Sequence, residues 1–310
     1  MQMNIILLII GLALLIFGAN WLVDAASSLA RKLGLSEFFI GLVIVGFGTS
    51  FPELVVSLTG AVQENADVAV GNVLGSNIFN VFVILGVTAL IRPLKMSREN
   101  LRRDIPVLVG ATLLVLVFGL GGRLFGGCTD ILSRGEAAVM LALFLIYIIY
   151  CFLSGDSRDV QEEKPDISTG FALLMILPAL VALIGGGELF VDAAVNIARS
   201  LGVSDKFISV TILAAGTSLP ELVTNIAAAV KGRGEMALGN ILGSNVFNLL
   251  LILGCSALIT PLSFANINVV DIIALILSAL LIPVLRGKRS QGVMLLTIFI
   301  LYFIYLIIQL

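Results

Sequence analysis

The sequence predicts an all-α membrane protein with ten transmembrane helices, arranged as two inverted repeats of five helices each. Three observations favour this fold class. Of the 310 residues, 59% are hydrophobic and 12% are charged, whereas soluble domains average about 45–50% and about 25%. The chain contains ten apolar stretches close to the length of about 20 residues that crosses the hydrocarbon core. Its two halves also align with each other.

The composition excludes several classes of protein and site. A net charge of −2 without a basic run argues against nucleic-acid binding. The chain has no histidine, which removes histidine zinc sites and histidine general bases. Three scattered cysteines, Cys128, Cys151 and Cys255, predict neither a disulfide framework nor a cysteine metal cluster. The first apolar run lacks a basic n-region and a cleavage site, so we interpret it as a retained helix.

The apolar stretches define the expected helices in chain order. They cover 3–27, 36–62, 66–90, 104–120, 131–153, 169–197, 204–230, 235–259, 267–285 and 291–309. The first and sixth are long, so we expect them to tilt in the bilayer. The polar segment 154–167 is a short linker between a first repeat, 1–153, and a second repeat, 168–310.

The distribution of basic residues predicts the orientation. Ten spans place both termini on one side of the membrane. The side that carries the connection between the first two helices holds 14 of the 18 Lys and Arg residues. Because basic residues accumulate in cytoplasmic loops, we expect that side and the linker 154–167 to be cytoplasmic and both termini to lie outside. An integral protein of the plasma membrane is expected.

The repeat is visible at an offset of 168 residues. Positions 18–86 align with 186–254 without a gap, and 34 of the 69 positions are identical. The matches include Gly, Pro, Ser, Asn and acidic positions, which apolar composition alone would not produce. Since each half has five helices, the second half enters the membrane upside down. Inverted repeats are typical of secondary transporters with sites at the midplane; the alternative is a duplicated membrane protein without a transport role.

The densest identity lies in two pairs of motifs. GTSFPE at 48–53 and GNVLGSNIFN at 71–80 match GTSLPE at 216–221 and GNILGSNVFN at 239–248. Proline removes a backbone donor, so Pro52 and Pro220 should break the second and seventh helices near their middle. Carbonyl groups freed inside a membrane need a cation, a hydroxyl group or water as partner.

Glu53 and Glu221 are expected in the middle of the membrane, where an ionised side chain is costly and by default marks an ion path. Neighbours three or four residues away on a helix share a face with the glutamate, and inverted packing can bring four such faces together. Helices 2, 3, 7 and 8 should form this central core. The candidate metal-binding residues are Glu53, Glu221, Thr49, Thr217, Ser50, Ser218, Ser76, Ser244, Asn80 and Asn248.

This candidate set offers only oxygen ligands, which suit hard cations such as Ca²⁺. Two glutamates carry a charge of −2, which one Ca²⁺ or two Na⁺ would neutralise. A site that holds either one Ca²⁺ or two Na⁺, but not both at once, is the basis of an exchanger. More than two Na⁺ per Ca²⁺ would move net charge across the membrane.

Several of these residues also have a packing interpretation. The Gly71–Gly75 and Gly239–Gly243 pairs are small-xxx-small motifs, which let helices approach closely. Single Ser or Asn residues in membrane helices often join helices. A second group of asparagines could either support the site or serve packing: Asn72, Asn77, Asn240 and Asn245. Asp24 and Asp192 are repeat mates near helix ends, where capping or snorkelling competes with a role at the ion path.

The paired blocks resemble the two α-repeats of the cation/Ca²⁺ exchanger superfamily, in particular its prokaryotic Na⁺/Ca²⁺ exchangers. The resemblance implies alternating access, in which helices 1 and 6 slide across the rest. It implies that Glu53 and Glu221 are the central Ca²⁺ ligands. The Na⁺ and Ca²⁺ sites would be completed by Ser50, Ser218, Ser76, Ser244 and the backbone of Thr49 and Thr217.

Two departures from relatives of this superfamily matter. Some relatives, notably K⁺-dependent ones, carry Asp where this chain has Asn at one of the positions 80 and 248. Two asparagines therefore argue against K⁺ co-transport. The short linker leaves no room for the large cytosolic Ca²⁺-sensing domains of animal exchangers.

We therefore expect a secondary antiporter that exchanges Na⁺ for Ca²⁺, without enzymatic activity, bound cofactor or required protein partner, and functional as a monomer. A first alternative is a H⁺/Ca²⁺ or other divalent-cation antiporter, because burial disfavours the charged form of Glu53 and Glu221. A second is a cation channel. A third, an intramembrane hydrolase, would have only the two glutamates as a catalytic pair.

Overall fold

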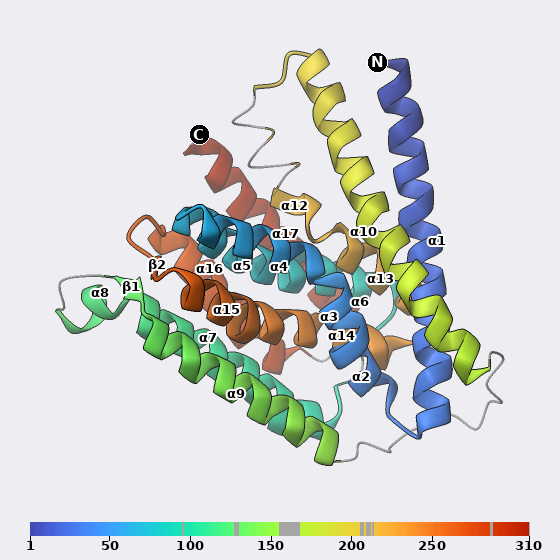
Figure 1. The fold of residues 1–310 in the computed structure, drawn as a ribbon, viewed down its shortest axis with the longest axis horizontal. Coiled ribbons are helices and arrows are strands. Elements are labelled where there is room, and N and C mark those ends of the chain that lie inside the picture. The colour runs from blue at the N-terminus through green and yellow to red at the C-terminus, as the bar shows by residue number, and fades with distance from the viewer. Residues whose placement is uncertain are drawn as a thin grey trace.

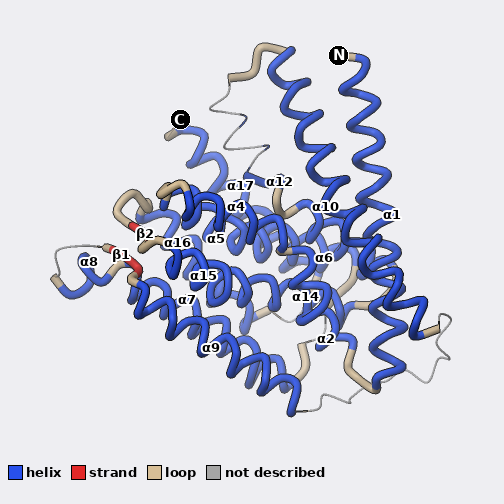
Figure 2. Tube along the Cα trace, viewed as in Figure 1, coloured by secondary structure: helices blue, strands red, loops and turns tan. Residues whose placement is uncertain are grey.

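The computed structural model describes residues 1–94, 96–126, 130–154, 168–204, 208, 212, 214–285 and 288–309. Almost all of these residues are helical, with one two-stranded ribbon at an edge (Figure 2). Figure 1 shows a bundle of roughly parallel helices, with two long helices, α1 and α10, lying side by side across one end of it. The helical class predicted from the sequence is therefore confirmed.

The first half contains helices at each predicted position. Their bounds are α1 (Gln2–Leu33), α2 (Glu37–Ile40), η1 (Gly41–Val45), α3 (Gly46–Thr49), α4 (Phe51–Val62), α5 (Ala66–Phe79), η2 (Asn80–Leu85), α6 (Gly86–Ile91), η3 (Asn100–Asp104), α7 (Ile105–Gly119), α8 (Gly121–Phe125) and α9 (Arg134–Leu153). Several of these segments run on into one another, so a predicted span can consist of two or three of them.

The second half repeats this order. Its elements are α10 (Thr169–Ser200), α12 (Ala214–Gly216), α13 (Leu219–Val230), α14 (Gly234–Val246), η5 (Phe247–Ile252), α15 (Leu253–Ile259), α16 (Val269–Leu281), η6 (Ile282–Val284) and α17 (Arg289–Ile308). The strands β1 (Ile131–Leu132) and β2 (Leu262–Ser263) pair antiparallel and join loops from the two halves. The N-terminal part of the helix predicted at 204–230 lies largely outside the described residues.

Not every predicted span is long enough to cross a membrane by itself. Within the part of the chain that the structure describes, six continuous helices have sufficient length and apolarity, and a seventh span results if the bent pair Glu37–Thr49 and Phe51–Val62 counts as one. The segments Leu219–Val230 and Val269–Val284 are shorter apolar helices. An integral membrane protein follows from these helices, whereas the count of ten complete spans stays a prediction.

Both predicted helix breaks are present. The two parts of the first broken helix meet at 47°. Ser50 between them has φ −82° and ψ 9°, outside the helical range. Ser218, the repeat mate of Ser50, has φ −89° and ψ 7° directly before α13. Because Pro52 and Pro220 lack an N–H group, each helix restarts with its first turn at the proline.

The long helices α1 and α10 pack through small residues. A β-carbon built on Gly11 would lie 2.8 Å from the carbonyl oxygen of Gly186, and one built on Gly18 would lie 2.8 Å from that of Ala179. Positions 11 and 179, and positions 18 and 186, are related by the repeat offset of 168. The same contact therefore occurs twice with the partners exchanged, as at a two-fold axis.

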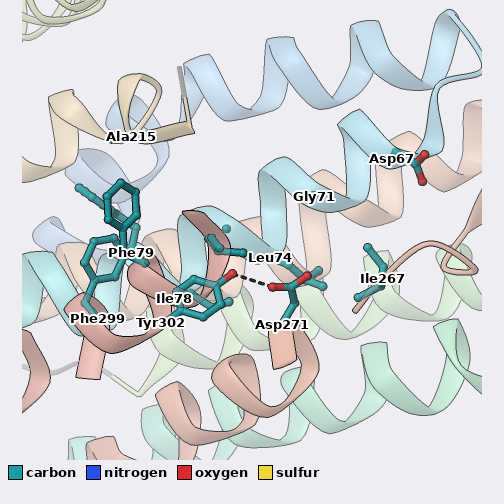
Figure 3. A pocket seen from close by; sticks show the side chains of 13 residues that line it. Asp67, Gly71, Leu74, Ile78, Phe79, Ala215, Ile267, Asp271, Phe299 and Tyr302 are labelled. Carbon is teal, nitrogen blue, oxygen red and sulfur yellow. Dashed lines mark hydrogen bonds between the residues drawn. The ribbon is translucent and has the colours of Figure 1, made fainter. Parts of the chain in front are cut away.

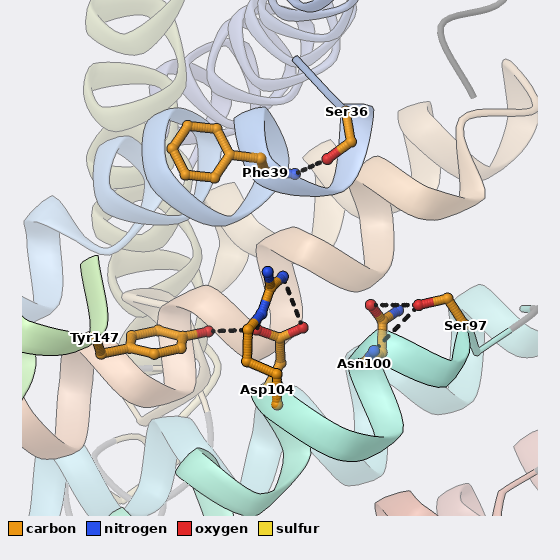
Figure 4. A network of polar contacts seen from close by, with 7 residues as sticks. Ser36, Phe39, Ser97, Asn100, Asp104 and Tyr147 are labelled. Atoms are coloured by element: carbon orange, nitrogen blue, oxygen red, sulfur yellow. Dashed lines mark hydrogen bonds and ion pairs between the residues drawn. The ribbon is translucent and has the colours of Figure 1, made fainter. Parts of the chain in front are cut away.

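A buried ionic network joins α9 to the start of α7 (Figure 4). The Asp104 side chain is fully buried and forms an ion pair with Arg103, with Nε 2.8 Å from Oδ1. The Tyr147 hydroxyl group on α9 donates a hydrogen bond to the same carboxylate at 3.0 Å. These bonds hold α9 against the start of α7, so a charge buried at that position is compensated locally.

The two glycine pairs behave differently, which corrects the expectation that both serve close packing. A β-carbon on Gly243 would lie 2.5 Å from the carbonyl oxygen of Leu42, and one on Gly239 would collide with that of Phe38. In contrast, β-carbons on Gly71 and Gly75 would have open space around them, because these residues line a cavity of about 610 Å³. Figure 3 shows Gly71 on the α5 wall of this cavity, opposite Tyr302 and Asp271.

This difference predicts unequal effects of an added methyl group. Gly239→Ala should lower the melting temperature of the detergent-solubilised protein, because overpacking against Phe38 costs about 1–3 kcal/mol. The matched substitution Gly71→Ala should leave the melting temperature unchanged or raise it, since alanine favours a helix over glycine by about 1 kcal/mol. Equal destabilisation of both variants in a thermal-unfolding measurement would contradict the observed packing.

Candidate ion-binding site

Glu53 and Glu221 occupy equivalent positions in the first turn of α4 and of α13. Their exposed fractions are 1% and 2%. Each carboxylate follows directly after a helix break, near a helix N-terminus, where the backbone dipole favours negative charge. The breaks thus place both acidic groups in the interior of the protein at points where part of their charge is compensated.

Two serines connect the glutamates across the two halves. The Ser50 hydroxyl group donates a hydrogen bond to Glu221 Oε1 at 3.0 Å. Ser218, its repeat mate, donates to Glu53 Oε1 at 3.0 Å. Sequence spacing had placed Ser50 on the face of Glu53, but its hydrogen bond goes to the glutamate of the other half. Each carboxylate is therefore held by the opposite repeat.

The threonines are also bonded across the halves, to asparagines whose role the sequence left open. The Thr49 hydroxyl group contacts Asn240 Oδ1 at 3.2 Å, and that of Thr217 contacts Asn72 Oδ1 at 3.4 Å. Thr49 also donates to the carbonyl oxygen of Val45 at 3.0 Å. With their hydroxyl groups engaged in this way, the threonines stabilise the two helix breaks.

Ser76 and Ser244 are not equivalent in their contacts. Ser76 donates to Glu53 Oε1 at 3.4 Å and accepts a contact from Ser218 at 3.3 Å. Ser244 instead contacts the carbonyl oxygen of Gly46 and Asn240 Oδ1, each at 3.4 Å. The structure therefore brings Ser76 to its glutamate and directs Ser244 to the broken helix of the first half.

Four asparagines form a second reciprocal pair of bonds. Asn80 Nδ2 donates to Asn245 Oδ1 at 3.0 Å, and Asn248 Nδ2 donates to Asn77 Oδ1 at 3.3 Å. Asn80 begins the π-helical segment η2, and Asn248 lies in the corresponding segment η5. π-Helical turns inside α-helices often occur at functional sites. No sequence signal had pointed to these π segments.

The site contains buried oxygen atoms without a hydrogen-bond donor. Glu53 Oε2, Glu221 Oε2, Asn80 Oδ1 and Asn248 Oδ1 are all buried and unpartnered. Buried polar atoms without a partner are rare in folded proteins and costly. The two amide oxygens are acceptors only, and the two carboxylate oxygens are acceptors only when the glutamates are ionised. The four atoms form two pairs related by the repeat offset. Carboxylate and amide oxygens of this kind are the ligands that hard cations prefer.

Two further asparagines, which the candidate list omitted, hold the backbone of the glutamates. Asn72 Nδ2 donates to the carbonyl oxygen of Glu53 at 3.1 Å and to Ser57 Oγ at 3.0 Å. In the second half, Asn225 replaces Ser57 and donates directly to the carbonyl oxygen of Glu221 at 2.8 Å. The position of Asn225 four residues after Glu221 was the available signal, because it places both on one helix face.

A cavity lies beside the site, next to the long helix α10. It measures about 470 Å³, lies between α10 and the start of α4, and is lined among others by Glu188, Asp192, Asn72 and Thr217. Asp192 therefore borders an opening beside the site. Asp24, its repeat mate, forms an ion pair with Lys231 at 2.7 Å instead.

Metal-binding clusters of other kinds are not found in the described ranges. Among those residues, no group of three or more His, Cys, Asp and Glu side chains could hold a metal ion. The candidate site differs from such clusters because it combines only two carboxylates with hydroxyl and amide oxygens.

Comparisons with known proteins agree with this arrangement. The family model described as sodium/calcium exchanger protein matches residues 3–153 and 171–310. The sodium/calcium exchanger MaX1 of Methanosarcina acetivorans is 33% identical over an alignment of 343 positions, which covers 98% of each chain. The inner membrane protein YrbG of Escherichia coli is 38% identical over 268 residues, covering 82% of this chain and 79% of its own.

A solved structure shares the fold. The sodium-calcium exchanger NCX_Mj, soaked with Na⁺ and Sr²⁺, superimposes with a TM-score of 0.84 at 31% sequence identity, over 98% of this chain and 97% of its own. The family match covers nearly the whole chain, and the two motif blocks lie within it. The chain therefore belongs to the sodium/calcium exchanger protein family of the cation/Ca²⁺ exchanger superfamily.

Proposed function

We propose that this membrane protein is a secondary antiporter that exchanges Na⁺ for Ca²⁺ by alternating access. The observation that carries the proposal is the set of four unpartnered buried oxygens, two from glutamates and two from asparagines, at a site shared by both halves. The family is one of transporters and not of enzymes, so the ions are substrates and no catalytic role is assigned.

The charge of the site supports exchange between these two ions. Glu53 and Glu221 together supply two negative charges when ionised. One Ca²⁺ neutralises both, and so do two Na⁺, whereas simultaneous occupancy would leave excess positive charge in a region of low dielectric constant. The proposed ligands are the two glutamates, the hydroxyl groups of Ser50, Ser218, Ser76 and Ser244, the side chains of Asn80 and Asn248, and the broken backbone at Thr49 and Thr217.

Reciprocal bonding supports the proposed architecture of two inverted five-helix repeats, 1–153 and 168–310, with α4, α5, α13 and α14 at the centre. Ser–Glu, Thr–Asn and Asn–Asn bonds each occur twice with partners related by an offset of 168. A two-fold relation between the halves would produce this pattern. The bonds close within one chain, which fits a monomer that needs no protein partner.

A H⁺/Ca²⁺ antiporter remains the alternative, since a protonated carboxyl group would also satisfy Glu53 Oε2 or Glu221 Oε2. Asn80 Oδ1 and Asn248 Oδ1 are unpartnered as well. The hydroxyl groups of four serines around the two glutamates favour Na⁺ as the counter-ion. The plasma-membrane location, cytoplasmic linker and outside termini are part of the same proposal, because the basic residues cluster on one side.

Flux through reconstituted protein tests the exchange. Proteoliposomes loaded with Na⁺ and diluted into Na⁺-free buffer at equal pH should accumulate ⁴⁵Ca²⁺. Glu53→Gln and Glu221→Gln should each lower uptake on the order of 100-fold, because divalent affinity depends on the number of charged ligands. Uptake that ignores the Na⁺ gradient and follows an imposed pH gradient would establish the proton antiporter instead.

The crossed serine bonds predict a symmetric loss of affinity. Ser50→Ala and Ser218→Ala should each weaken Ca²⁺ binding by about 10- to 100-fold, since a hydrogen bond to a charged group is worth about 1.5–3 kcal/mol. Equilibrium ⁴⁵Ca²⁺ binding to purified protein measures this effect. Ser278→Ala is the matched control, because Ser278 is also buried but bonds only to the Leu275 carbonyl oxygen. Ser50 and Ser218 variants that bind like the control would remove these serines from the site.

The two asparagines predict independence from K⁺. Ca²⁺ uptake driven by Na⁺ should proceed at the same rate when K⁺ is replaced by choline on both sides, because Asn80 and Asn248 add no third carboxylate. A strict requirement for K⁺ in this flux assay would show that the site binds an additional monovalent cation.

A further inference from the structure

The loops that follow the two glutamate helices share a backbone shape but differ in charge. The loop between α13 and α14 reads Lys231-Gly232-Arg233, and its repeat mate between α4 and α5 reads Gln63-Glu64-Asn65. Both turns have a residue in the left-handed region at their centre, Gly232 with φ 80° and Glu64 with φ 55°. One loop therefore has two basic residues where the other has two neutral amides.

Both basic residues form ion pairs with helices of the first half. Lys231 Nζ lies 2.7 Å from Asp24 Oδ1 and donates a second hydrogen bond to the carbonyl oxygen of Asn20 at 2.9 Å, so it attaches the loop to α1. Arg233 Nη1 lies 2.9 Å from Glu37 Oε1, at the start of α2. We call Lys231 and Arg233, with Asp24 and Glu37, the basic clasp.

The protein is closed where the clasp lies. In α1, Leu22 and Ala26 are fully buried, and they belong to one apolar cluster with Ala227 and Ala228 of α13. At the related position of the second half, α10 is separated from α4 by the cavity of about 470 Å³. Therefore α1 packs directly against α13, whereas a cavity separates α10 from α4, although the sequences of the two long helices repeat.

Among the described residues, the open face has no counterpart of the clasp. Asp192 and Glu188, the repeat mates of Asp24 and Asn20, line the cavity. The neutral residues Gln63 and Asn65 stand where Lys231 and Arg233 would be needed. Among the residues that the structure describes, no basic side chain forms an ion pair with Asp192.

We propose that the basic clasp determines the sidedness of exchange, by holding α1 and α2 against the α13–α14 loop whenever the face beside α10 is open. This inference rests on the proposed alternating access, in which the α1 face must open and these ion pairs must separate. Because the interactions exist in one state only, they shift the population towards that state. Partly exposed pairs of this kind change a population by about two- to fivefold each.

Cysteine accessibility measures this shift without any ion flux. In a background with Cys128→Ser, Cys151→Ser and Cys255→Ser, Ala228→Cys reports opening of the α1 face and Val191→Cys reports the cavity beside α10. Lys231→Gln with Arg233→Asn copies the two neutral residues Gln63 and Asn65 of the first-half loop. In nanodiscs without Na⁺ or Ca²⁺, this double variant should raise the rate of Ala228→Cys labelling by a membrane-impermeant maleimide by about tenfold or less, and should slow labelling of Val191→Cys.

Matched variants separate the clasp from general charge effects. Gln63→Lys with Asn65→Arg should produce the opposite shift, because it offers Asp192 a basic partner on the open face. The charge exchange Asp24→Lys with Lys231→Asp should restore the original labelling ratio if the pair itself matters. Lys32→Gln removes an exposed charge near the end of α1 and should leave the ratio unchanged.

The outcomes distinguish the clasp from the exchange activity. Unchanged labelling in the Lys231→Gln, Arg233→Asn variant, or an equal change in Lys32→Gln, would overturn the clasp even if Na⁺-driven Ca²⁺ uptake is intact. The predicted shift of both reporters would support the clasp even in a protein whose uptake proved to be driven by protons. Size-exclusion profiles and restoration by the charge exchange show whether a variant is folded.

Discussion

Two carboxylates buried in the interior of a membrane protein are the constraint on which the rest of this structure depends. Within the described residues, neither Glu53 nor Glu221 has a basic partner, and each uses one oxygen for hydrogen bonds and leaves the other unpartnered. Burial of such groups is unfavourable unless other groups compensate their charge. The helix breaks supply dipoles and free backbone groups, the crossed serines supply donors, and the remaining oxygens are the proposed cation ligands.

In the proposed exchanger, a two-fold relation between the halves would let one site serve both faces of the membrane. Each half contributes a glutamate, and the other half contributes the serine that holds it. A movement of α1 and α10 that exposes one face is therefore related by symmetry to one that exposes the other. The symmetry is incomplete: Ser57 is replaced by Asn225, and Gln63 and Asn65 are replaced by the basic residues Lys231 and Arg233. Among the proposed ligands, Ser76 contacts its glutamate, whereas Ser244 contacts the broken helix of the first half.

Much of the site could be predicted from the sequence, because it depends on local chemistry. A proline inside a helix breaks it, so Pro52 and Pro220 predicted the two helix breaks. The repeat offset of 168 identified the paired glutamates. The crossing of Ser50 to Glu221 could not be predicted, since spacing along a helix shows which residues share a face but not which helix lies opposite. The π segments at Asn80 and Asn248 and the open surroundings of Gly71 likewise depend on how complete helices pack. Identical GxxxG motifs gave no indication that only one of them would be in close contact.

The central claim is that Na⁺ and Ca²⁺ compete for one set of oxygens shared by both halves. Equilibrium binding of ⁴⁵Ca²⁺ to the purified protein, titrated with Na⁺ at constant pH and ionic strength, tests this claim most directly. We expect a single Ca²⁺ per chain, displaced completely by Na⁺ with a Hill coefficient above 1, because more than one Na⁺ is needed to replace its charge. Calcium that stays bound at saturating Na⁺, or that is displaced only by protons, would contradict the account.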